Sequence, residues 1–86
     1  MLVIVVYDVP AQRTRIYRKL LRQKLEHIQH SVFYGNLTEG QLTKLKNQIE
    51  DQLVPEDSVM VFEAETEDYV DYTVFGSAES PGSRFT

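Results

Sequence analysis

The spacing of hydrophobic positions changes along the chain, and these changes mark strands and helices. Residues 2–7 form the longest apolar run and are rich in β-branched side chains. Because this run is too short for a buried helix, it predicts a central β-strand. Both faces of the strand are apolar, so helices packed on one side of a sheet leave the other face to be covered by something else. Asp8 follows on the side of Ile4 and Val6, and Pro10 ends the strand, which puts a carboxylate at the rim of an apolar sheet.

A helical period follows from residue 12 to about residue 27. Its apolar positions fall on one arc at about 100° per residue. They are Ile16, Tyr17, Leu20, Leu21, Leu25 and Ile28. Residues 27–37 then predict one kinked strand or two short ones, with bend points at Ser31 and Gly35.

The remaining elements follow a second helix. Thr38 and Gln41 have the spacing of a capping box, and the amphipathic helix that they begin ends before Pro55. Two further strands are predicted over residues 58–65 and 69–75. The order of elements is typical of an α+β fold, a ferredoxin-like split βαβ sandwich with an additional C-terminal strand.

The length of the chain and the composition of its end predict its domain organisation and its oligomeric state. We expect one domain over residues 1–75 and, because the end of the chain is rich in turn residues, a flexible or partner-ordered tail over residues 76–86. A chain of 86 residues buries only about 60–65% of the surface that its unfolded form exposes. A homodimer is therefore expected. An RNA-recognition module is not indicated, because residues 31–35 lack its basic and aromatic motif.

Composition and charge narrow the chemistry. Cysteine is absent, which excludes disulfides, cysteine-based zinc sites and thiol nucleophiles. No apolar run approaches the roughly 18 residues of a membrane span, and no signal peptide is recognisable, so we expect a cytoplasmic protein without membrane contact.

The charge is divided unevenly along the chain, whose net charge is −4. Residues 1–46 hold eight of the nine Lys and Arg with three acids, whereas residues 47–86 hold ten acids with Arg84 alone. The first half suits a polyanionic partner, and the second would repel one.

Four cations share one face of the first predicted helix. They are Arg15, Arg18, Lys19 and Arg22. Interspersed acids would mark an ordinary solvated face, but only Glu26 lies beyond this group. Arg13 and Lys24 lie nearer the apolar edge, and Arg13 is grouped with the four cations as a nucleic-acid-binding residue. We therefore favour a face that binds the phosphates of RNA or duplex DNA, with a solvated surface as the alternative.

Several segments together resemble one known family. An apolar first strand closed by Tyr7 and Asp8, an arginine-rich first helix, the segment 29–37 (QHSVFYGNL) and a second amphipathic helix are similar to the CRISPR-associated protein 2 family. The resemblance spans about residues 1–75. It implies a ferredoxin-like homodimer that acts in CRISPR adaptation with an integrase partner. Various members of this family act as metal-dependent endoribonucleases or endodeoxyribonucleases.

The resemblance also implies roles for individual residues. The first-strand aspartate that binds metal in the family matches Asp8, which Tyr7 precedes. The family's early helix arginines correspond to Arg13 and Arg15. Its motif serine and phenylalanine fall on Ser31 and Phe33.

The physical argument for Asp8 is independent of the family. Mg²⁺ takes six oxygen ligands, usually one or two carboxylates with water and phosphate, and Mn²⁺ accepts a similar set. A two-fold dimer that pairs the uncovered sheet faces would bring two copies of Asp8 together. A metal held there would activate a water for phosphodiester hydrolysis without another protein base. The alternative is that Asp8 simply ends the strand or caps the next helix.

Other candidates are weaker. His27 and His30 have no third metal ligand in view and are more typical of a structural role. Ser31 has no partner base, so it bends the strand or contacts phosphate. Phe33 suits the core or the dimer interface better than base stacking. The acids of the last two strands suit a solvated turn better than a second metal site; they are Glu63, Glu65, Glu67, Asp68 and Asp71.

Three functional hypotheses remain. The first is a metal-dependent endonuclease that cuts RNA or DNA through paired Asp8 residues. The second is a non-catalytic dimeric adapter that holds duplex DNA on its basic helices and docks an integrase through its tail. The third is a small-molecule sensor, which no glycine-rich phosphate loop supports. CRISPR adaptation is the process that we favour.

Overall fold

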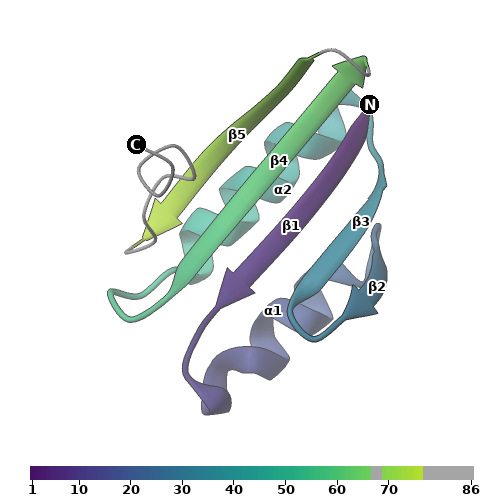
Figure 1. The fold of residues 1–86 in the computed structure, drawn as a ribbon. Helices are drawn as coiled ribbons and strands as arrows, with labels where there is room; N and C mark the ends of the chain where they lie inside the picture. The colour runs from purple at the N-terminus through teal and green to yellow at the C-terminus, as the bar shows by residue number, and fades with distance from the viewer. Residues whose placement is uncertain (67–68, 77–86) are drawn as a thin grey trace, which may run out of the picture.

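The computed structural model describes residues 1–66 and 69–76. The elements in chain order are β1 (Leu2–Asp8), the short 3-10 helix η1 (Ala11–Arg13), α1 (Thr14–Leu21), β2 (Glu26–Gln29), β3 (Val32–Asn36), α2 (Glu39–Gln52), β4 (Ser58–Thr66) and β5 (Tyr69–Gly76). The strands form one five-stranded sheet in the order β2-β3-β1-β4-β5, and all neighbours are antiparallel (Figure 1). The first four strands follow the ferredoxin-like order, with β5 added at the edge. The α+β prediction is confirmed.

The core lies between the sheet and the two helices, which lie on the same side of it (Figure 1). Successive side chains of a strand point to opposite faces, so alternate residues of β1 face the helices. The buried strand residues on this side are Val3, Val5, Tyr7, Phe33, Val59 and Val61. They meet Tyr17 and Leu21 of α1 and Ile49 of α2, which are also buried.

The opposite face of the sheet is apolar and uncovered by any described element. At its centre Ile4 of β1 pairs in register with Tyr34 of β3 and Phe62 of β4. Val6 pairs with Met60 in the same way. Tyr34 is 39% exposed, and Leu2, two residues before Ile4 on β1, is also 39% exposed. We call this surface the open face.

The local predictions differ in outcome. The capping box is confirmed, because the Gln41 backbone N–H donates to the Thr38 hydroxyl and the Gln41 side chain accepts from the Thr38 N–H. Of the two alternatives for residues 27–37, one kinked strand or two short ones, the structure shows two short strands, β2 and β3. The turn between these strands bends at His30, whose φ is +46°.

The first helix is much shorter than its hydrophobic period predicts. It ends at Leu21, and residues 26–29 pair with β3 instead of continuing the helix. Leu25 still packs into the core, but Ile28 is 53% exposed at the edge of the sheet. The prediction of a helix to about residue 27 is wrong. Residues 26–29 satisfy their backbone hydrogen bonds by pairing with β3 and not by a further helical turn.

The predicted tail begins at Gly76, and its residues 77–86 lie outside the described part of the chain. None of the described helices is long and apolar enough to cross a membrane.

Candidate functional site

Asp8 stands at the end of β1, exposed, on the side of the open face. Its register partner is Ser58, the first residue of β4, and Ser58 in turn pairs with Gly76 of β5. Three strands therefore meet beside this carboxylate. Within residues 1–66 and 69–76, no hydrogen bond or ion pair involves the Asp8 side chain. The carboxylate is thus available to a ligand at the rim of the open face.

Within residues 1–66 and 69–76, no group of three or more His, Cys, Asp or Glu that could hold a metal ion is found. The ring nitrogen Nε2 of His27 lies 2.6 Å from the His30 carbonyl oxygen, and the ring stacks on Phe33 at 4.7 Å. These contacts support a structural role for the histidine pair. Glu63 forms an ion pair with Lys46 at 2.9 Å.

The basic face of α1 forms as predicted. Its cations are exposed and border an open depression beside Ala11 and Thr14. The four cations are Arg15, Arg18, Lys19 and Arg22. Neither of the two ion pairs among the described residues includes any of them. The positive charge of this surface, which we call the basic face, is therefore not neutralised within the described chain.

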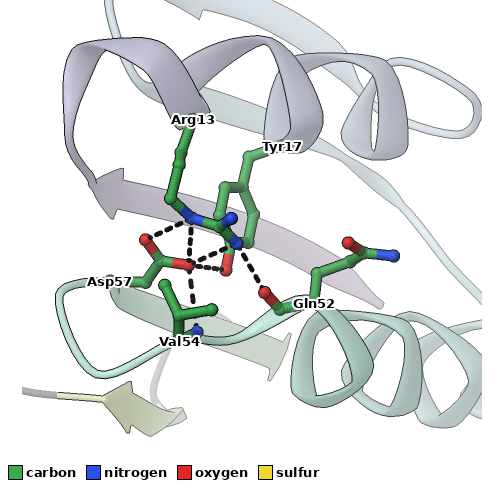
Figure 2. Close-up of polar contacts among 5 residues, drawn as sticks. All are labelled: Arg13, Tyr17, Gln52, Val54 and Asp57. Atoms are coloured by element: carbon green, nitrogen blue, oxygen red, sulfur yellow. Dashed lines mark hydrogen bonds and ion pairs between the residues drawn. The ribbon is translucent and has the colours of Figure 1, made fainter.

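Arg13 lies apart from the basic face and has an intramolecular partner (Figure 2). Its Nε donates to both carboxylate oxygens of Asp57, at 3.0 and 3.1 Å. Its Nη2 lies 3.0 Å from the same carboxylate and donates to the Gln52 carbonyl oxygen at 2.6 Å. The sequence analysis groups Arg13 with the nucleic-acid-binding arginines, but the structure commits its guanidinium to Asp57.

Asp57 is fully buried and accepts two more hydrogen bonds. The Tyr17 hydroxyl donates to it at 2.6 Å, and the Val54 N–H donates at 3.2 Å. Burial raises the pKa of Asp57, but the hydrogen bonds from Arg13, Tyr17 and Val54 outweigh it, so this pKa lies below its usual value of 3.8. Burial, together with the hydrogen bond to Asp57, raises the pKa of Tyr17 to about 12. At neutral pH the cluster therefore holds an ionised carboxylate, a protonated phenol and a guanidinium.

The supporting residues predicted from the sequence lie mostly inside. Tyr7 is 2% exposed, and its ring stacks on Tyr17 at 5.7 Å and on Phe33 at 6.2 Å. Its N–H donates to the Ser31 carbonyl oxygen at 3.1 Å. Phe33 is fully buried, which confirms the core prediction and leaves its ring without access to a base.

Asp57 is the functional candidate that the sequence analysis did not find. It stands in a turn after Pro55, where an acid is ordinarily solvated. Its partner Arg13 is 44 residues away in the sequence. No local pattern links the two.

The chain is similar to the proteins of one known family. A sequence model of the family described as CRISPR associated protein Cas2 matches residues 1–71. The chain belongs to the Cas2 family. A protein of Haloferax volcanii named CRISPR-associated endoribonuclease Cas2 is 64% identical over 86 residues, which cover 100% of both chains. A protein of the same name from Methanothermobacter thermautotrophicus is 33% identical over 79 residues, 91% of this chain and 87% of its own.

Solved structures of the family agree with the fold. A crystal structure of Cas2 is 36% identical, covers 94% of this chain and 92% of its own, and superposes with a TM-score of 0.68. The Cas2 crystal structure from Streptococcus pyogenes, at 20% identity and a TM-score of 0.58, covers 98% of this chain and 94% of its own and supports the fold alone. The resemblance inferred from the first strand and residues 29–37 is confirmed.

Proposed function

We propose that this protein is a homodimeric, metal-dependent endoribonuclease that acts in CRISPR adaptation. The observation that supports it most is the position of Asp8, an exposed carboxylate at the rim of the open face without a partner among residues 1–66 and 69–76. The basic face starts only a few residues further along the chain. Relatives with 64% and 33% identity are named as endoribonucleases, and this name guides the choice of RNA as substrate.

The open face supports the dimer. Apolar side chains such as Ile4, Phe62 and Met60 form a continuous surface across neighbouring strands. A surface of this kind on a small domain gains stability when a second copy covers it, at about 25 cal/mol for each Å² of apolar area removed from water. A two-fold axis through this face makes each residue of one copy meet the equivalent surface of the other. Asp8 borders the face, so an axis that passes close to this rim brings the two copies of Asp8 together.

The donor set fits a hard divalent cation. An Asp8 carboxylate from each chain gives the one or two protein carboxylates that Mg²⁺ usually takes, and Mn²⁺ accepts the same oxygen ligands. When bound, such an ion polarises a phosphoryl oxygen and lowers the pKa of a coordinated water. Asp8 would hold the ion, and the neighbouring Ser58 offers a neutral hydroxyl at the same rim.

The basic face supplies the binding energy for the substrate. Arg15, Arg18 and Arg22 are exposed on one side of α1 and contact no acid in the described chain. Contacts of this type go to backbone phosphates, so binding is expected to be independent of base sequence and to weaken as salt rises.

The test replaces Asp8 by Asn, which keeps the size of the side chain and removes its charge. We expect wild-type protein to cleave a single-stranded RNA with Mg²⁺ and not with EDTA. Asp8→Asn protein should lose this cleavage while it remains dimeric. Asp51→Asn, which removes an exposed charge on α2, is the matched control and should cleave as wild type does. Cleavage by Asp8→Asn at the wild-type rate would show that the activity lies elsewhere.

A second function, a dimeric adapter that bridges integrase subunits on duplex DNA, is favoured by one observation. The basic face is complete without Asp8, so nucleic-acid binding does not need a metal site. An adapter predicts that wild-type protein binds duplex DNA and captures the integrase without cutting RNA. Removal of residues 77–86 should abolish capture if the tail docks the partner, whereas capture by the shortened protein would exclude that route.

A further inference from the structure

The Arg13–Tyr17–Asp57 cluster lies beside the end of β1, where Asp8 stands. Asp57 directly precedes Ser58, which is the register partner of Asp8. Arg13 ends η1, five residues after Asp8, and reaches back to the Asp57 carboxylate with two hydrogen bonds (Figure 2). The segment that leaves β1 is thereby tied to the segment that enters β4.

Tyr17 of α1 adds a second connection, between Asp57 and the end of β1 before Asp8. Its hydroxyl donates to Asp57 at 2.6 Å, and its ring stacks on Tyr7, the residue before Asp8. Asp8 is thus held by contacts to the residue before it, to the turn after it and to the strand beside it. The first two run through the Asp57 carboxylate, and the third pairs Asp8 with Ser58, the residue after Asp57.

Asp57 is itself fixed by the end of β5. Gly76 has a φ of +85°, and a Cβ at this position would overlap the Asp57 carbonyl oxygen. Only glycine combines this backbone conformation with so close an approach. The backbone of Asp57 is therefore held against β5 while its side chain holds α1.

We infer that Asp57 is a positioning residue for Asp8, acting through Arg13 and Tyr17 to fix the point at which β1 leaves the sheet. A buried ion pair is a weak source of net stability, because desolvation of the charges offsets their attraction. A fully hydrogen-bonded polar cluster instead restricts geometry, and a site must hold its groups within about 0.5 Å to act.

This inference rests on the proposed function for what Asp8 does, but the restriction of the β1 end is independent of any activity. It also separates Arg13 from the arginines of the basic face. Variants of Arg13 should behave like variants of Asp57, with slower cleavage and an unchanged dependence of RNA binding on salt. Variants of Arg18 should instead lower the dependence of RNA binding on salt.

The experiment compares Asp57→Asn with Leu45→Ala, a core change on α2 that lowers stability and leaves the cluster intact. Three quantities are measured on dimeric protein: kcat and KM for Mg²⁺-dependent RNA cleavage, and hydrogen exchange of the backbone amides of residues 7–13, apart from Pro10. For Asp57→Asn we expect kcat to fall by about 10- to 100-fold with KM within about twofold, since a misplacement of about 1 Å costs this much. Exchange of these amides should rise while that of β3 stays unchanged.

Leu45→Ala should keep wild-type kcat per folded dimer and wild-type exchange at residues 7–13. If Asp57→Asn does not fold, Tyr17→Phe, which keeps the ring and removes one donor, should give a smaller change in the same direction. Wild-type kcat and exchange in these variants would overturn the inference, as would an equal loss in Leu45→Ala. Absence of cleavage by wild-type protein would refute the proposed function, and the exchange measurement would still decide the inference.

Discussion

The basic face allows a prediction whose size follows from the number of cations. Replacing Arg18 and Arg22 by Ala removes two of its four charges without touching the core, because both side chains are exposed. Each phosphate contact to a single strand contributes about 0.7 to the slope of log affinity against log salt. The slope should therefore fall by about 1.4 if one subunit binds the strand, and by about 2.8 if both do.

The change in slope has a direct consequence for affinity. Between about 50 and about 200 mM salt, a slope lower by 1.4 means that the variant loses about sevenfold less affinity than wild type. The assay is a fluorescence-anisotropy titration of a labelled RNA at several salt concentrations, within the range in which the circular dichroism of the protein is unchanged. RNAs of unrelated sequence should give the same slope, since backbone contacts do not distinguish bases.

Two matched variants make this result interpretable. Lys44→Ala removes an exposed cation from α2, off the basic face, and should leave the slope unchanged. Arg13→Gln should also leave it unchanged, because the Arg13 guanidinium is bound to Asp57. The reasoning is refuted if the double variant keeps the wild-type slope, or if Lys44→Ala lowers it as much.

Three further predictions follow from the structure. Ile4→Lys places a charge at the centre of the open face and should convert the dimer into a monomer, which light scattering would detect. A wild-type protein that is a stable monomer would contradict the proposal that the open face forms the dimer. The folded pKa of Asp57 lies below 3.8, so its contribution to stability is complete above that pH and is lost as pH falls through the folded value. Chemical denaturation should therefore show a smaller loss of stability in acid for Asp57→Asn than for wild type, and equal losses would contradict this. Gly76→Ala should lower the unfolding temperature, since the left-handed backbone and the Asp57 carbonyl leave no space for a methyl group, and an unchanged temperature would contradict this.

Much of the site could be predicted because it depends on local rules. The two-residue period of a strand decides that Asp8 shares a face with Ile4 and Val6, and the structure agrees. The capping box at Thr38 and Gln41 is likewise a contact between residues three apart. In both cases the determining geometry lies within a few residues.

The parts that were missed depend on distant contacts. Leu25 and Ile28 fit a helical period, yet residues 26–29 pair with β3, and nothing in their own spacing shows this. Arg13 looks like its neighbours on the basic face until the fold brings it to Asp57. A carboxylate that arrives from 44 residues away changes the role of the arginine without changing the sequence around it.

The measurement that tests the central claim most directly is cleavage by mixed dimers of wild-type and Asp8→Asn chains. If the two copies of Asp8 form one site, a mixed dimer has half a site and is inactive, so activity falls with the square of the wild-type fraction. Equal amounts of the two chains, allowed to exchange subunits, should then give about one quarter of the wild-type rate at the same total concentration. A rate of about one half, falling linearly with the wild-type fraction, would mean that each Asp8 acts alone and would contradict the paired site.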